Sequence, residues 1–235
     1  MPIRSKVESL DWPRIGQSLD ARGHAVLPGL LDTAQCEALR ALYPDEHRFR
    51  SRVVMARHGF GRGEYQYFRY PLPLPLEHLR QALYPHLAPI ANRWNDALGI
   101  DPHFPETLDA FLSRCHLAGQ TRPTPLLLQY GPGDYNCLHR DLYGELVFPL
   151  QLAILLSEPG REFEGGEFVM TEQSSSDRRA TVVDLRQGDA VLFAVNQRPV
   201  AGKRSTARKV AMQHGVSVVR QGQRYTVGVI FHDAL

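Results

Sequence analysis

This sequence of 235 residues contains few cysteines and tryptophans and carries little net charge. The three cysteines, Cys36, Cys115 and Cys137, form no Cys-x-x-Cys pair, which argues against a disulfide scaffold and a thiolate zinc site. Such cysteine usage is typical of a reducing compartment, so we expect a cytoplasmic protein. The net charge of +2 is too small to indicate nucleic-acid binding by itself, so the distribution of charge along the chain matters more.

Long apolar runs are also missing. The longest, Leu146–Leu156, contains Pro149 and Gln151 and is too short to span a bilayer, and Met1–Asp11 is charged, unlike a secretory signal. We therefore expect no membrane partner. The apolar fraction of 43% and the charged fraction of 22% are those of a folded globular domain, which argues against disorder and coiled coil.

The two halves of the chain differ in pattern, although no linker separates them. Residues 1–122 favour helices, most clearly Leu76–Leu98, where apolar residues recur at helical spacing. Residues 123–235 favour short strands separated by turns that contain glycine. We expect a single domain of the mainly β (α+β) class, with a jelly-roll core over 123–235 and a helical support region over 1–122 that buttresses one sheet. The expected strands are Leu126–Tyr130, Leu146–Leu156, Glu167–Thr171, Ala180–Leu185, Ala190–Ala194, Val210–Val219 and Arg224–Phe231.

Two segments carry candidate metal ligands. His139 and Asp141 are two residues apart, and residues i and i+2 of a strand face the same side, so both side chains can reach one cation. Taken alone, this pair is equally consistent with surface polar residues. His214, however, lies in an otherwise apolar predicted strand near the C-terminus. Two imidazoles and one carboxylate form the set that binds non-haem Fe(II) and leaves coordination positions open for other ligands.

A candidate anion site follows ten residues after His214. Arg224 opens the last predicted strand, and Thr226 lies two residues further along. A buried arginine offers a rigid fork of N–H donors that matches a carboxylate. We therefore expect an acidic ligand at this strand.

In order and spacing, these residues resemble the Fe(II)/2-oxoglutarate-dependent dioxygenases, whose core is a double-stranded β-helix. The resemblance rests on His139-x-Asp141, then His214, then Arg224-x-Thr226. An upstream Tyr130-x-x-Gly133 is similar to the prolyl-4-hydroxylase branch, in which a tyrosine at this position hydrogen-bonds 2-oxoglutarate. As a whole, the chain most resembles a bacterial oxygenase family described as acting oxidatively on methylated, damaged DNA.

The resemblance implies an enzyme that uses Fe(II), 2-oxoglutarate as co-substrate and O2. Such enzymes couple decarboxylation of 2-oxoglutarate to succinate with hydroxylation of a substrate C–H bond. The implied iron ligands are His139, Asp141 and His214, and the implied 2-oxoglutarate contacts are Arg224, Tyr130 and Thr226. A flat hairpin turning at residues 221–222 would leave His214 about 16 Å from Arg224, too far for a five-carbon dicarboxylate. We therefore expect the chain to cross to a facing sheet between the two residues.

The resemblance leaves the substrate open. Prolyl 4-hydroxylases usually have lysine where this chain has Arg224 and threonine where it has Phe168, whereas alkylated-base demethylases have asparagine where it has Leu128. We expect oxidative demethylation of alkylated DNA bases, and the alternative is hydroxylation of a protein side chain of the prolyl type. A sensor module that binds metal and 2-oxoglutarate without turnover is an alternative of another class.

Two basic segments are candidate nucleic-acid contacts. Segment 47–69 alternates six arginines with aromatic residues around a single acid, Glu64, and segment 198–209 contains five basic residues and no acid. Arginine and aromatic side chains together can hold phosphates and stack on bases. The plainer interpretation is a solvated loop and an edge strand whose aromatic side chains pack on the core. As candidate substrate contacts we name Arg62, Tyr65 and Tyr135.

Overall fold

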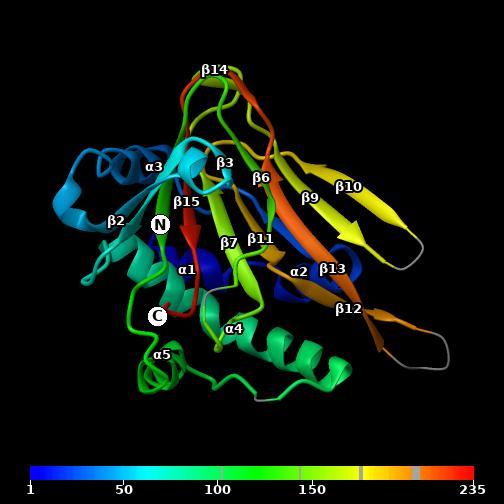
Figure 1. Cartoon of the computed structure of the whole chain (residues 1–235). Helices are drawn as coiled ribbons and strands as arrows, with labels where there is room; N and C mark the ends of the chain where they lie inside the picture. The colour runs from blue at the N-terminus through cyan, green and yellow to red at the C-terminus, as the bar shows by residue number, and fades with distance from the viewer. Residues whose placement is uncertain (102, 143, 175–176, 203–206) are drawn as a thin grey trace.

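The computed structural model of the chain describes residues 1–101, 103–142, 144–174, 177–202 and 207–235 (Figure 1). The helices in these ranges are α1 (Ile3–Glu8), α2 (Trp12–Arg22), α3 (Thr33–Arg40), α4 (Leu74–Leu98) and α5 (Leu108–Leu117), with short 3-10 helices η1 (Glu46–Arg48) and η2 (Met55–Arg57). The strands of the first half are β1 (His24–Leu27), β2 (Phe49–Val54), β3 (Gly61–Arg62) and β4 (Glu64–Phe68). Those of the second half are β5 (Leu126–Tyr130), β6 (Tyr135–His139), β7 (Leu150–Leu155), β8 (Phe163–Gly165), β9 (Phe168–Gln173), β10 (Arg178–Val183), β11 (Ala190–Ala194), β12 (Gln197–Ala201), β13 (Ala207–Val216), β14 (Val219–Gly222) and β15 (Arg224–Val229).

Two antiparallel sheets form the body of the molecule. The larger sheet has seven strands in the order β1-β11-β7-β15-β5-β4-β2. The smaller has six, in the order β10-β9-β13-β6-β3 with β12 beside β13, and β14 and β8 pair separately. The predicted fold class, a mainly β jelly roll with helices on one side, is confirmed.

The main core lies between the larger sheet and α4. On this side of the sheet, Leu152 and Ile154 of β7 and Val227 of β15 join one buried cluster with Leu79 and Leu83 of α4. The period of α4 explains its position, because apolar residues three and four apart form one face that the sheet covers. In Figure 1, α4 crosses the sheet and α1 and α2 lie close to it. The support helices therefore occupy one face of the larger sheet and leave its other face to the smaller sheet.

Strands β5 and β11 coincide with the predicted ranges, and α4 begins two residues before the predicted helix. The first half differs from expectation, since β2, β3 and β4 add strands to both sheets. Burial does not alternate along β2, where Phe49 is buried, Arg52 is exposed and the other four residues are half-buried. β2 is the edge strand of the larger sheet, so its sequence lacks the alternation that predicts a strand.

The chain crosses between the sheets after His214, as the spacing to Arg224 predicts. Strand β13 belongs to the smaller sheet, β14 pairs with β8 outside both sheets, and β15 lies within the larger sheet. The two residues therefore lie on facing sheets. Within the described ranges, no helix is long and apolar enough to cross a membrane.

Candidate active site

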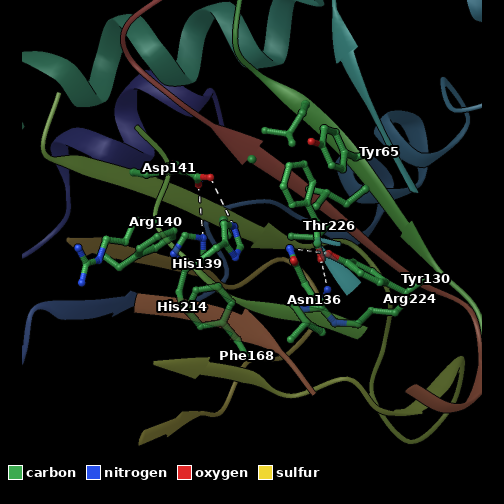
Figure 2. A pocket seen from close by; sticks show the side chains of 18 residues that line it. Tyr65, Tyr130, Asn136, His139, Arg140, Asp141, Phe168, His214, Arg224 and Thr226 are labelled. Atoms are coloured by element: carbon green, nitrogen blue, oxygen red, sulfur yellow. Dashed lines mark hydrogen bonds and ion pairs between the residues drawn. The ribbon is translucent and has the colours of Figure 1, made fainter. Parts of the chain in front are cut away.

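Two histidines and an aspartate meet where β6 and β13 pair. His139 is the last residue of β6 and stands opposite His214 of β13 in the ladder, and Asp141 follows two residues after the strand ends. The Nε2 atoms of His139 and His214 each lie 3.4 Å from a different carboxylate oxygen of Asp141 (Figure 2). One donor atom from each residue lies within 4.8 Å of the others, which is a spacing that one metal ion can bridge.

The surroundings hold both imidazole rings in place. His139 Nδ1 donates a hydrogen bond to the backbone oxygen of Cys137 at 2.7 Å, and its Nε2 faces Asp141. The ring of His214 packs against Phe193 at 4.5 Å and against Phe168 at 5.9 Å between ring centroids. Aromatic packing thus fixes one ring and a backbone hydrogen bond fixes the other.

The protonation preferences of Asp141 and His214 suit a cation. Burial alone would lower the pKa of His139, but its hydrogen bond to Asp141 raises it. Burial alone would raise the pKa of Asp141, but hydrogen bonds from His139 and His214 lower it well below its usual value. Burial lowers the pKa of His214, so its imidazole is neutral at physiological pH. Asp141 is therefore an anion beside a neutral imidazole, which is the protonation state that metal ligands need.

Arg224 of β15 lies across the interior from the histidines. Its side chain is 1% exposed, Nη1 donates to Thr226 Oγ1 at 2.5 Å, and Nε has no hydrogen-bond partner among the described residues. No carboxylate of the described chain comes within ion-pair distance of this guanidinium, and burial lowers the pKa of Arg224 to about 10. A charge buried in this way is costly unless an anion joins it.

Tyr130 completes the surroundings of Arg224. It is paired with Arg224 in the β5–β15 ladder, its ring centroid lies 5.5 Å from the guanidinium carbon, and Asn136 Nδ2 approaches its hydroxyl at 3.4 Å. Burial raises the pKa of Tyr130 to about 12, so the hydroxyl stays protonated and can donate. Gly166 leaves room for the arginine, because a Cβ there would lie 2.8 Å from Arg224 Cδ.

A single cavity of about 190 Å³ connects the two groups. The triad lines it from the smaller sheet, and Arg224, Tyr130 and Thr226 line it from the larger sheet (Figure 2). Its remaining wall is largely apolar. Such a site can hold a metal ion beside an acidic ligand and exclude water from both.

A family model described as "Oxygenase, catalysing oxidative methylation of damaged DNA" matches residues 63–234. The chain belongs to this oxygenase family. An uncharacterized protein of Mycobacterium tuberculosis, found in two strains, is 48% identical over 168 residues, which cover 71% of this chain and 72% of that protein.

Solved structures share the fold of this oxygenase. An oxidoreductase of the 2OG-Fe(II) oxygenase family from Burkholderia pseudomallei matches with a TM-score of 0.53 and 16% identity, over 96% of this chain and 93% of that one. A prolyl 4-hydroxylase from Phytophthora capsici matches with a TM-score of 0.53 and 15% identity, over 96% of this chain and 62% of that one. The predicted superfamily and the prediction of an enzyme are confirmed. The Burkholderia description names 2-oxoglutarate and Fe(II), which are among the cofactors predicted for this oxygenase.

The predicted substrate contacts separate in the structure. Tyr65 of β4 lines the cavity, whereas Arg62 and Tyr135 pair with each other in the β3–β6 ladder and are not among its lining residues. Six polar or aromatic lining residues were not named from the sequence as site residues: Phe60, Asn136, Arg140, Gln151, Phe168 and Phe193. Arg140 lies between two predicted ligands, so its position in the sequence could have indicated it. Gln151 lies in an apolar run and gave no such indication.

The basic segments of the oxygenase are partly occupied by structural contacts. In segment 47–69, Arg52 pairs with Glu64 at 2.6 Å and Arg50 packs on the Tyr67 ring at 4.4 Å. Arg57, Arg62 and Arg69 are exposed and have no ion pair within the described ranges. In segment 198–209, Arg198 is buried against Glu172 at 2.8 Å, while Arg208 and Lys209 are exposed. Lys203 and Arg204 lie outside the described residues.

Proposed function

We propose that this oxygenase uses Fe(II), 2-oxoglutarate and O2 to remove methyl groups from alkylated bases of nucleic acid. One observation carries the cofactor assignment: a buried arginine without a described carboxylate partner faces a His-Asp-His triad across a largely apolar cavity. The arginine calls for an acidic ligand and the triad calls for a cation. A dicarboxylate that also coordinates the metal satisfies both.

The donor set fits Fe(II). His139, Asp141 and His214 offer two neutral nitrogen atoms and one carboxylate from one side, which leaves the opposite side open. The hydrogen bond from His139 Nδ1 to a backbone carbonyl is the outer contact that orients a metal-binding imidazole. The charges also fit, because Fe(II), Asp141, the 2-oxoglutarate dianion and Arg224 together are neutral, as a dry cavity requires.

When bound, Fe(II) supplies the chemistry by which O2 converts 2-oxoglutarate to succinate and CO2 and hydroxylates a C–H bond. One oxygen atom of O2 goes to succinate and the other to the hydroxylated substrate. The residues of this chain position the reactants. Arg224 and Thr226 bind the distal carboxylate, and the Tyr130 hydroxyl donates a further hydrogen bond to it. Phe168 and Phe193 keep water from the triad.

The substrate assignment rests on the family description and on the rim of the cavity. Phe60 is 47% exposed, lines the cavity and stacks on His58 with ring centroids 5.5 Å apart. Arg140, also exposed, lines the cavity, and in Figure 2 its guanidinium extends away from the triad. An aromatic ring and a cation at the same cavity are the combination that binds a base and its phosphate. Oxidation of an N-methyl group gives an N-hydroxymethyl group that releases formaldehyde and restores the unmethylated base.

Prolyl-type hydroxylation remains the alternative, and it rests on fold similarity alone. We also propose that the protein works in the cytoplasm. Its three free thiols, Cys36, Cys115 and Cys137, support a reducing compartment.

Anaerobic titration of the protein with Fe(II) and then 2-oxoglutarate tests the cofactor assignment. We expect a weak visible charge-transfer band, and succinate after oxygen is admitted. A folded protein that gives neither would contradict the cofactor assignment.

The substrate is then tested with a single-stranded oligonucleotide carrying 1-methyladenine, with its unmethylated counterpart as control. Formaldehyde from the methylated strand alone, and binding that weakens steeply with salt, support the proposal. Hydroxyproline formed in a proline-rich peptide without formaldehyde from the oligonucleotide would favour the alternative.

A further inference from the structure

Gln151 is a polar side chain of the cavity that neither the triad nor the 2-oxoglutarate contacts use. It lies on β7, opposite Phe193 of β11, and its side chain lines the cavity with that of Ala153 two residues further on. The alternation of the strand explains this, since Leu150 and Leu152 point to the other face and join the main core. An amide therefore stands in a wall that is otherwise mostly apolar.

This amide is buried and incompletely hydrogen-bonded. Gln151 is 5% exposed, and its Oε1 atom has no hydrogen-bond partner in the described part of the chain. A buried carbonyl oxygen without a donor destabilises a fold, and leucine would fill a similar volume without that cost. Gly228 on the neighbouring strand β15 also lines the cavity, so the space beside the amide is that of the cavity itself. The amide and the space beside it point to a ligand that supplies the missing donor.

The co-substrate is not that ligand. In the β7–β15 ladder, Leu155 stands opposite Thr226, at the arginine end of the cavity. Gln151 is four residues further along the strand, about 13 Å away. A five-carbon dicarboxylate held by Arg224 does not extend that far. The group that is oxidised is the reactant that can reach this end of the cavity and supply the donor.

We propose that Gln151 hydrogen-bonds the substrate base inside the cavity and selects bases that carry an exocyclic amino group. This inference rests on the proposed function. 1-Methyladenine and 3-methylcytosine present an amino group, which donates to Oε1, whereas 3-methylthymine presents a carbonyl oxygen in its place. Bound 3-methylthymine would leave the buried Oε1 acceptor without a donor, so the site discriminates against this base.

The test compares wild type with Gln151→Leu on matched single-stranded oligonucleotides that carry 3-methylcytosine or 3-methylthymine. Wild type is expected to release formaldehyde faster from 3-methylcytosine, and the variant to lose about five- to a hundredfold of that preference in kcat/KM. Succinate formation without substrate should not change. Because the variant removes an unpaired buried acceptor, its melting temperature should rise, which no structural role of the amide would produce. Gln129→Leu is the matched control, since Gln129 lies on β5 of the same sheet and bonds Tyr225 instead of lining the cavity.

The outcomes separate the two proposals. An unchanged base preference in Gln151→Leu, or a lower melting temperature than wild type, would overturn the role of Gln151 and leave the demethylase intact. Succinate without formaldehyde from either oligonucleotide in wild type would overturn the proposed substrate, and with it this inference.

Discussion

Replacement of Arg224 by methionine links fold stability to co-substrate binding through one side chain. Its guanidinium is buried, and burial lowers its pKa from 12.5 to about 10. That change corresponds to about 3 kcal/mol of free energy that disfavours the charged side chain. Methionine removes the charge and keeps most of the volume. Without 2-oxoglutarate, Arg224→Met is therefore expected to be more stable than wild type, by up to about 3 kcal/mol in chemical denaturation.

With 2-oxoglutarate present, the order should reverse. Truncating one partner of a buried, hydrogen-bonded charge pair costs about 2–5 kcal/mol, so the affinity for 2-oxoglutarate should fall at least about thirtyfold. Anaerobic calorimetry of the Fe(II)-loaded protein measures this affinity directly. The thermal stabilisation that 2-oxoglutarate gives wild type should be absent from the variant.

Arg220→Met is the matched control, because it removes the same charge from an exposed arginine on β14 that lies outside the cavity. This variant should differ from wild type neither in its stability without 2-oxoglutarate nor in its affinity for 2-oxoglutarate. If Arg224→Met were less stable than wild type in the absence of 2-oxoglutarate, or bound it within threefold of wild type, the reasoning from the unpaired buried charge would be refuted.

Four further substitutions test the site and the fold. Asp141→Ala removes the carboxylate between the two histidines and should abolish succinate formation and the Fe(II)–2-oxoglutarate band; retained turnover would contradict the triad. Gly166→Ala places a Cβ 2.8 Å from Arg224 Cδ at a φ of +63°, so it should weaken 2-oxoglutarate binding and destabilise the protein by about 1 kcal/mol or more; unchanged titration and melting curves would count against the close approach. Phe60→Ala should weaken binding of a methylated single strand by about 1–3 kcal/mol in fluorescence anisotropy, without changing succinate formation in its absence; equal affinities would remove the stacking role. His232 accepts the Phe148 N–H at Nδ1 and burial lowers its pKa to about 4, so folding stability should be complete above pH 6.5, fall by about 2 kcal/mol at pH 5 and level off below pH 4; His232→Asn should flatten this part of the pH profile in urea denaturation.

The chain order of the candidate ligands could be predicted because it depends on local rules. His139 and Asp141 are two residues apart, so they face the same side of a strand. His214 and Arg224 are ten residues apart, and in a flat hairpin they would lie too far from each other to bind one ligand. The strands β5 and β11 could be predicted for the same reason, since apolar runs bounded by turn residues are properties of short segments.

The partners of charged residues could not be predicted in this way. In the sequence, Arg50, Arg52 and Arg198 look as free as Arg57, yet the first three are held by Tyr67, Glu64 and Glu172. Each of these contacts depends on which strands lie side by side, and the pairing of β2 with β4 or the approach of β12 to β9 is decided by the packing of the whole chain. Several arginines of the basic segments are therefore engaged in contacts within the fold, which the sequence alone does not reveal.

By itself, the sequence determined the class of the fold, the residues that can bind a metal and the arginine that can bind an acid, because residue type and spacing suffice for these. Only the tertiary structure decided that Arg224 is buried without a described carboxylate, that Phe60 and Arg140 stand at the rim, and that Gln151 faces the cavity with an unpaired oxygen. Burial and the absence of a partner are properties of everything that surrounds a side chain. No local pattern contains them.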